Sequence, residues 1–340
     1  MPLTTIRDIA AESGFSVSTV SRVLAGHPDV SPSTAAAIQA VIARRHFAVN
    51  RNASNLKRSG TTTILVVVKG RYNMLFAAML EHVQTAITAS GHTAVTQYID
   101  EDDNEVAEAE HLVAEIKPRG VVFLGGDAAN MITDADRIGP ECPAVVLTNS
   151  VSLAGRPGVS SITTDDRAAA RLAADYLLDN GHRRIGVIGG IPERSIISRH
   201  RQEGVIAAMG VRGVPFDVHT QYAGTRFSLE CGYEATFQLL DDVPDVTAIY
   251  AMSDIMALGA LRALHERGLD VPGDISLIGH DGIELASYVV PKLVTIRQPQ
   301  EVMASRGIEI LMGHLAGNSD PVEEFEPVTV VEGESVKPIG

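Results

Sequence analysis

A short segment near the start of the chain divides its side chains sharply between two faces. If residues 17–24 form a helix, one side is apolar and carries Val20, Val23 and Leu24. The other side carries short side chains and one cation, namely Val17, Ser18, Ser21 and Arg22, with Thr19 at its edge. Arginine can donate two hydrogen bonds to guanine, serine can donate or accept, and valine can contact a thymine methyl group. These residue types predict a helix that reads base edges in the major groove.

Local signals place two more helices around this segment. Thr5 precedes an acidic residue at the spacing of a capping box, and Gly14 begins a turn after the first helix. Ser16 can cap the second helix, and Ser31 can cap a third with Pro32 at its first position. Helix, four-residue turn and helix form the helix-turn-helix arrangement, whose second helix enters the major groove. An ordinary three-helix domain with a solvated serine face remains the alternative.

The charge of the chain is divided unevenly. The 340 residues carry a formal net charge of −14, but residues 1–59 hold seven lysines and arginines against three acidic residues, which gives +4. The remainder therefore carries −18. A small basic module on an acidic body is typical of a protein whose small part alone contacts a polyanion. The alternative, that this asymmetry is incidental, stays open.

Composition and motifs argue against several other classes. Cys142 and Cys231 lie far apart without a CxxC spacing, so we expect no disulfide framework, metal site or cofactor. The first residues lack the apolar core of a signal peptide and no run of about 18 apolar residues occurs, so we expect a cytoplasmic protein without membrane contact. No Walker, G-x-G-x-x-G, nucleophile-elbow or HExxH pattern is present, so we expect no enzyme. The acidic run "DEDDNE" at residues 100–105 lacks the spacing of a calcium loop and is interpreted as the solvated start of a helix.

From residue 61 onward, apolar runs alternate with amphipathic segments. The buried strands that this pattern predicts are "TILVVV", "HTAVTQYI", "GVVFLGG", "AVVLTNS", "RIGVIGG", "TAIYAM" and "ISLIGH", with a late strand "VTIRQ". Strands of this kind separated by helices predict parallel sheets with helices on both faces. Such sheets bind ligands beyond the carboxyl ends of their strands.

Several motifs together resemble one known family. The segments "TIRDIAAESGFSVSTVSRVLAG", "VNRNASNLKRSGT", "DDRAAARLAADYLL", "GHRRIGVIGG" and "DISLIGHDG" are similar in order and spacing to the lactose/galactose repressor (LacI/GalR) family. The resemblance implies an all-α helix-turn-helix head at residues 1–49, a hinge at 50–60 and a bilobed, periplasmic-binding-protein-like α/β core at 61–340. It places lobe one at about 61–161 and 291–320, and lobe two at about 162–290 and 321–340.

The resemblance also implies which residues contact DNA. These residues are Thr5, Ser16, Val17, Ser18, Thr19, Ser21, Arg22, Asn50, Arg51, Ala53 and Leu56. Residues 50–58 are too few for a stable free helix, and the family relation implies that they become helical on DNA. Leu56 would then wedge into the minor groove, while Ala53 allows two hinges to pack closely. The alternative is that Leu56 docks on its own domain.

A second set of residues matches the positions that contact the effector in the family. These residues are Asn73, Phe76, Asn149, Arg201, Phe227, Ser253, Asp281 and Gln298. Asp281 can accept hydrogen bonds from two adjacent hydroxyls, and Arg201 can donate two in parallel. The alternatives are an Arg201–Asp281 salt bridge and aromatic rings that belong to the core. Asp254 is interpreted as the N-cap of the helix that follows it.

Four positions depart from the family pattern, which often has Asn-Pro-Phe-Phe in the first loop, Asp at position 149 and Asn at position 253. This chain has Asn73-Met74-Leu75-Phe76, Asn149 and Ser253. The effectors of other members therefore do not transfer directly, and a sugar or sugar derivative is the first expectation, with a nucleoside or cyclitol as alternatives.

The sequence thus predicts an effector-controlled transcriptional regulator, most simply a repressor. It would bind a pseudopalindromic operator as a homodimer or dimer of dimers. Corepression and activation stay open as modes of control. A solute-binding protein would need a signal peptide and no DNA-binding head, an enzyme would need a reactive cluster in the cleft, and a nucleoid protein would bind DNA without sequence preference.

Overall fold

The computed structural model describes residues 6–24, 30–45, 62–70, 73–134, 142–149 and 156–339. The chain divides into two compact units, Met1–Thr61 and Thr62–Gly340, which we call the head and the body. In the part of the chain that the structure describes, no helix is long and apolar enough to cross a membrane.

The head contains three helices. They are α1 (Ile6–Ser13), α2 (Val17–Leu24) and α3 (Pro32–Arg44). Gly14 ends α1 with a φ of 75°, where a residue without a Cβ is favoured. The caps predicted at Ser16 and Ser31 are confirmed, because the amide of Thr19 donates to Ser16 Oγ and that of Thr34 donates to Ser31 Oγ, both at 3.2 Å. The cap predicted at Thr5 lies outside the described residues.

Apolar side chains from all three helices form the core of the head. Ile9 of α1, Val20 of α2 and Ile38 of α3 are fully buried. Each contributes about 1.5–3 kcal/mol when it leaves water. Glu12 of α1 also pairs with both arginines at the end of α3, at 2.9 Å to Arg44 Nη2 and 2.5 Å to Arg45 Nε. These contacts fix which face of α2 points away from the core.

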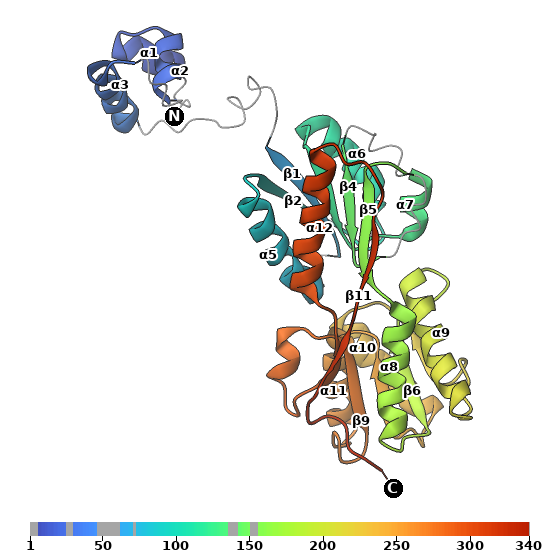
Figure 1. The fold of residues 1–340 in the computed structure, drawn as a ribbon. Helices are drawn as coiled ribbons and strands as arrows, with labels where there is room; N and C mark the ends of the chain where they lie inside the picture. The colour runs from blue at the N-terminus through green and yellow to red at the C-terminus, as the bar shows by residue number, and fades with distance from the viewer. Residues whose placement is uncertain are drawn as a thin grey trace. The chain divides into compact units, whose positions relative to one another are not determined.

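The body is built on two six-stranded sheets, each in its own lobe (Figure 1). The sheet of lobe one has the order β11-β5-β4-β3-β1-β2, and all its neighbouring strands are parallel. Its strands are β1 (Thr63–Lys69), β2 (Thr93–Ile99), β3 (Gly120–Leu124), β4 (Ala144–Leu147), β5 (Val159–Thr164) and β11 (Glu323–Glu326). β2 was predicted to be buried but lies at an edge, where Val95 and Tyr98 are partly exposed.

The sheet of lobe two has the order β12-β10-β9-β8-β6-β7. It is parallel except for β12, which runs antiparallel to β10. Its strands are β6 (Ile185–Gly189), β7 (Tyr222–Gly224), β8 (Ala248–Ala251), β9 (Ser276–Asp281), β10 (Val294–Arg297) and β12 (Thr329–Val331). The two sheets therefore have corresponding strand orders.

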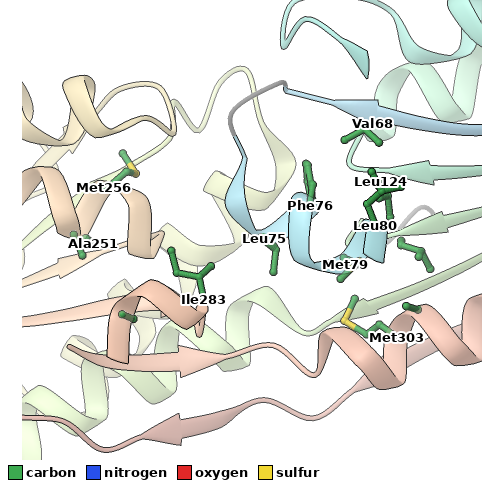
Figure 2. Packing of buried hydrophobic residues seen from close by; sticks show 14 of the residues in the cluster. Val68, Leu75, Phe76, Met79, Leu80, Leu124, Ala251, Met256, Ile283 and Met303 are labelled. Atoms are coloured by element: carbon green, nitrogen blue, oxygen red, sulfur yellow. The ribbon is translucent and has the colours of Figure 1, made fainter. Parts of the chain in front are cut away.

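Helices cover both faces of each sheet. In lobe one they are α5 (Met74–Ala89), α6 (Glu105–Ile116), α7 (Ala128–Asp134) and α12 (Gln300–Leu315). In lobe two they are α8 (Asp166–Asp179), α9 (Ile196–Val211), α10 (Leu229–Asp242), α11 (Asp254–Glu266) and the 3-10 helix η2 (Glu284–Ser287). Alternate residues of β1 illustrate the layering, since Val66 packs in the cluster with α5 and α12 whereas Val67 packs in the cluster with α6. The first of these clusters continues into lobe two through Met256 and Ile283 (Figure 2).

The chain crosses between the lobes three times, and two crossings differ from the prediction. The first follows β5, close to the expected boundary at 161. The second lies between β10 and α12, because β10 pairs with β9 of lobe two although residues 291–320 were assigned to lobe one. The third lies between β11 and β12, because β11 pairs with β5 of lobe one although residues 321–340 were assigned to lobe two. Both strands are short, so their sheet is decided by non-local pairing rather than by their own sequence.

The strand β5 was not predicted, because its sequence "VSSITT" is mostly polar. It nevertheless lies between β4 and β11, and its serines and threonines are buried. Ser160 Oγ lies 2.8 Å from His314 Nε2 of α12 and accepts a hydrogen bond from the amide of Val322 at 2.9 Å. Burial of such hydroxyls is tolerated when they have partners.

Candidate functional site

The exposed face of α2 carries the residues predicted to contact DNA. Ser16, Ser18, Ser21 and Arg22 are exposed, Val17 is 43% exposed and Thr19 is half-buried. Val20 and Val23 pack into the core of the head on the opposite side. The division of this helix into two faces is therefore confirmed, although contact with bases remains a prediction.

The polar atoms on this face are held close to the helix. Ser16 Oγ lies 2.7 Å from Ser18 Oγ and 2.9 Å from Thr19 Oγ1. Arg22 has no ion-pair partner among the described residues. It is thus the long, cationic side chain on a face that is otherwise short. The other predicted DNA contacts, Thr5, Asn50, Arg51, Ala53 and Leu56, lie outside the described residues.

In the body, a cavity of about 240 Å³ lies between the two lobes. Its walls are formed at the carboxyl ends of strands from both sheets, where α/β proteins commonly bind ligands. All eight residues predicted to contact the effector line this cavity: Asn73, Phe76, Asn149, Arg201, Phe227, Ser253, Asp281 and Gln298. The structure brings them together, and their contact with a ligand remains a prediction.

Arg201 forms the lobe-two floor of the cavity. Its Nε donates to Asp166 Oδ1 at 2.8 Å, and its Nη1 donates to the carbonyl oxygen of Met252. Both charged side chains are more than nine-tenths buried. Arg201 therefore does form a structural salt bridge, but with Asp166 rather than with Asp281. Sequence reasoning missed Asp166, whose only local signal is its place at the start of α8.

Asp281 lies beside this floor and is bound by the end of β10. Its Oδ1 accepts a hydrogen bond from Gln298 Nε2 at 2.8 Å. Burial raises the pKa of the Asp281 carboxyl, and the nearby Arg201 guanidinium opposes that rise. Asp281 also has a φ of 110°, which is unusual for a residue with a Cβ. Strained backbone of this kind clusters at functional sites.

The expected N-cap of α11 is corrected by one residue. Ser253 caps the helix, because its Oγ accepts from the amide of Met256 at 3.3 Å. Asp254 is instead fully buried and accepts hydrogen bonds from Thr295 Oγ1 at 2.6 Å and from the amide of Ile283 at 2.8 Å. Burial and the neighbouring Asp281 both raise the pKa of the Asp254 carboxyl. Ser253 still lines the cavity.

Two buried oxygen atoms on the lobe-one wall have no hydrogen-bond donor among the residues that the structure describes. The Nδ2 group of Asn149 donates to the carbonyl of Gly126, which leaves its Oδ1 as an acceptor without a partner. Thr148 Oγ1 is also buried and unpartnered, and Thr148 has a φ of 77°. Leaving such an atom buried and unbonded costs about 1–3 kcal/mol. A ligand that donates to these oxygens would recover that free energy.

Other predicted residues have structural partners as well as a place on the wall. Asn73 caps α5, with its Oδ1 accepting from the amides of Leu75 and Phe76 at 3.0 and 3.3 Å. Phe76 belongs to the apolar core, and Phe227 packs against the core clusters of lobe two. The alternative that both rings serve the core is therefore supported, although both also face the cavity.

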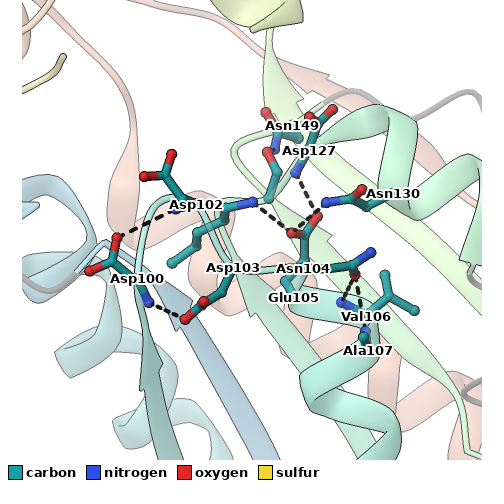
Figure 3. Close-up of polar contacts among 12 residues, drawn as sticks. Asp100, Asp102, Asp103, Asn104, Glu105, Val106, Ala107, Asp127, Asn130 and Asn149 are labelled. Carbon is teal, nitrogen blue, oxygen red and sulfur yellow. Dashed lines mark hydrogen bonds and ion pairs between the residues drawn. The ribbon is translucent and has the colours of Figure 1, made fainter. Parts of the chain in front are cut away.

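The rim of the cavity in lobe one is anchored by Glu105 (Figure 3). Glu105 is 1% exposed, pairs with Lys69 Nζ at 2.8 Å and accepts from the amide of Asp127 at 2.6 Å. The prediction of a solvated helix start is therefore wrong for Glu105. It holds for Asp100, Glu101 and Asp102, which are exposed.

A helix-turn-helix head joined to a bilobed body with a cavity between its lobes defines a DNA-binding regulator controlled by a small molecule. Residues 5–50 match the family described as bacterial regulatory proteins, lacI family, and residues 174–336 match the periplasmic binding protein-like domain. The chain belongs to the lacI family of bacterial transcriptional regulators.

Named relatives agree with this assignment along the full length. The chain is 32% identical to the HTH-type transcriptional regulator MalR of Clostridium butyricum, over 97% of this chain and 98% of that one. It is similar to the lac repressor dimer bound to operator and the anti-inducer ONPF, with a TM-score of 0.80, 25% identity and coverage of 99% and 100%. It is also similar to the transcriptional regulator CelR in complex with cellobiose, with a TM-score of 0.71, 28% identity and coverage of 98% and 99%. The relatives are regulators, which are not enzymes.

The raised pKa of Asp281 predicts how stability depends on pH. A carboxyl whose pKa is higher in the folded chain binds more protons when folded, so folding loses stability as the pH rises above about 4. Asp281→Asn cannot ionise and escapes this loss. In thermal unfolding at constant ionic strength, the melting temperature of Asp281→Asn should rise relative to wild type between pH 4 and 7.

Asp245→Asn is the matched control with the opposite sign. Hydrogen bonding to Arg184 lowers the pKa of the exposed Asp245 carboxyl. The melting temperature of wild type should therefore rise slightly relative to that of Asp245→Asn as the pH rises. A difference between Asp281→Asn and wild type that does not change with pH would contradict the assignment.

Proposed function

We propose that this protein is a repressor whose affinity for its operator is controlled by a neutral sugar bound between the lobes. We further propose that it acts in the cytoplasm as a homodimer on a pseudopalindromic operator. The ligand class is inferred from which polar groups in the cavity already have hydrogen-bond or ion-pair partners. Among the described residues, acceptors without donors coexist there with a half-buried lysine and a buried arginine that already have partners.

The unpaired acceptors favour a ligand rich in hydroxyl groups. Asn149 and Thr148, whose side-chain oxygens lack donors among the described residues, line the cavity from lobe one, and Asp281 lines it from lobe two. A sugar offers several O–H donors in fixed positions, which suits acceptors held on rigid strand ends. Phe76 and Phe227 offer apolar surface for its C–H faces.

The cations of the cavity disfavour a phosphorylated or acidic ligand. Among the described lining residues, Lys69 is paired with Glu105 and Arg201 with Asp166. Arg194 is exposed to solvent. A buried phosphate would need an unpaired guanidinium or ammonium group close by. A neutral ligand requires no such group.

Two contacts connect the cavity to the crossovers between lobes. Asp166 begins α8 directly after the first crossover and holds Arg201. Gln298 lies in the second crossover and binds Asp281, and Gln300 Nε2 donates to the carbonyl of Asp281 at 3.4 Å. A ligand that binds Arg201 and Asp281 therefore acts on groups that contact the crossovers between the lobes. It shifts the population of lobe arrangements to the extent that it binds one better than another.

A second copy of the chain is the proposed partner of the apolar segment that precedes β10. Leu285, Tyr288 and Val290 are 39%, 73% and 93% exposed within six residues. Exposed apolar patches of this kind mark protein interfaces. Two heads are also needed to read two half-sites. The predicted hinge contacts, Ala53 and Leu56 among them, belong to the same proposal.

The DNA-reading role of α2 is tested by Arg22→Ala. Loss of a bidentate contact to guanine should weaken specific binding by about 1–3 kcal/mol and relax discrimination at one base position. Selection from a random DNA library with the full chain gives the operator, and titration of single-base variants gives the discrimination. Gln39→Ala, exposed on α3, is the control and should leave base preference unchanged. Unaltered preference in Arg22→Ala would refute the role.

The ligand class is tested by thermal shift with cellobiose, ribose, glucose and glucose 6-phosphate. A neutral sugar at 100 times its Kd should stabilise the body by about 2.7 kcal/mol. Asp281→Ala should lose that shift while DNA binding by the head survives. Stabilisation by glucose 6-phosphate alone, or only by nucleosides or cyclitols added to the panel, would overturn the neutral-sugar proposal.

The dimer interface is tested by Tyr288→Asp combined with Val290→Asp. Two charges in an apolar interface should convert the dimer to a monomer in sedimentation velocity experiments. Val211→Asp, at a position 69% exposed on α9, controls for a charge placed on another apolar surface site. A dimer that persists in the double variant would place the interface elsewhere.

A further inference from the structure

One ion pair joins the two lobes away from the crossovers. Arg226, in the loop between β7 and α10, pairs with Asp102, in the loop between β2 and α6. Among the described residues it is the only salt bridge between a lobe-one and a lobe-two side chain. Both side chains are more than half exposed.

The strand order places this pair on the side of the cleft opposite the three crossovers between the lobes. The three crossovers leave β5, β10 and β11, which lie at or beside one edge of each sheet. β2 and β7, whose following loops carry Asp102 and Arg226, form the other edge of each sheet. The pair therefore lies at the side of the cleft where the lobes have no covalent link.

The pair also lies directly at the cavity. Glu101 and Phe227, the sequence neighbours of Asp102 and Arg226, both line the cavity, one from each lobe. The Arg226–Asp102 ion pair therefore spans the opening of the cavity on this side, which we call its mouth. A molecule that enters from this side must pass it.

The loop in lobe one is held in place by its own hydrogen bonds (Figure 3). The amide of Asp100 donates to Asp103 Oδ2 at 2.9 Å, and Asn104 caps α6 by accepting from the amides of Val106 and Ala107 at 3.0 Å. Glu105 then anchors the start of α6 through its buried pair with Lys69. Asp102 is thus presented by a rigid loop.

The loop in lobe two is anchored in the same way. The amide of Thr225 donates to the carbonyl of Gly189 at 2.8 Å, and Ser228 caps α10 through the amide of Cys231 at 3.1 Å. The ring of Phe227 packs against the core clusters. Because both loops are ordered without the ion pair, little loop entropy opposes its formation.

We propose that Arg226 and the acidic loop at residues 100–103 form a latch that holds the lobes together at the mouth of the cavity. One cation interacts with three carboxylates in that loop, Asp100, Glu101 and Asp102. Loss of Arg226 therefore removes the latch, whereas loss of Asp102 leaves other carboxylates to replace it. The existence of the latch does not depend on the proposed function. Its consequence, control of ligand exchange, rests on that function.

The test is hydrogen–deuterium exchange of the full-length protein without ligand or DNA, at low ionic strength. Exchange of cavity-lining amides at residues 125–127 and 194–197 reports how often the mouth opens. Arg226→Gln should raise exchange at both segments about two- to five-fold, as expected for loss of an exposed pair in a favourable setting. Asp102→Asn should have a smaller effect, and Arg226→Lys should retain most of the protection.

Arg184→Gln is the matched control, because Arg184 and Asp245 form an ion pair of similar exposure within lobe two. It should leave exchange at both segments unchanged, while 1 M salt should reproduce Arg226→Gln in wild type. Exchange in Arg226→Gln equal to wild type would overturn the latch, and so would Arg226→Lys matching Arg226→Gln. These outcomes are separate from the sugar screen, whose failure would leave the latch intact.

Discussion

The buried ion pair between Arg201 and Asp166 is the interaction on which the cavity of the body depends. Both groups have left water, so each is stable there only because the other is present. Removal of one partner from such a pair typically costs about 3–5 kcal/mol, since an uncompensated charge is left behind. The pair fixes the floor of the cavity and also ties that floor to the start of α8, where the chain has just crossed between lobes. In the proposed ligand complex, ligand contact and lobe arrangement would therefore share one set of atoms.

The two sides of the cleft are held by interactions of different strength. On the hinge side the contacts are buried, as in the Arg201–Asp166 pair and the hydrogen bond from Gln298 to Asp281. On the mouth side the Arg226–Asp102 pair is exposed and is screened by salt. Buried contacts persist through small motions, whereas exposed pairs open readily. We therefore expect the cleft to open on the side of the Arg226–Asp102 pair while the contacts beside the crossovers keep their geometry.

The sequence predicts the class of fold because long apolar runs report buried parallel strands directly. The same signal fails for β5, whose polar residues are buried and whose Ser160 bonds partners that lie far away in the sequence. It finds the strand β10 but not its lobe, and it misses β11, because the lobes of both strands are decided by pairing with β9 and β5. Local pattern specifies an element, but its neighbours in a sheet are specified by the whole chain.

The predicted cavity residues come together because each follows a strand, and the carboxyl ends of parallel strands meet at one edge. What sequence could not supply is which groups are already bonded. Arg201 was expected to be free for a ligand or paired with Asp281, and it is paired with Asp166. Thr148 was not singled out, since a threonine at a strand end has no local mark of being unpartnered. Pairing is a property of three-dimensional contacts, and it is the property that distinguishes a neutral ligand from a charged one.

The division of charge completes the physical account of the regulator. The basic head loses part of its attraction for phosphate, because Glu12 pairs with Arg44 and Arg45. The remaining chain carries −18 and repels DNA at close range. We therefore expect weak non-specific binding, and in the proposed dimer the affinity would rest on specific contacts made by two heads at once. Avidity of this kind is lost when geometry forbids simultaneous engagement, so in the proposed dimer we expect a modest change in the arrangement of the lobes to be enough to release the operator.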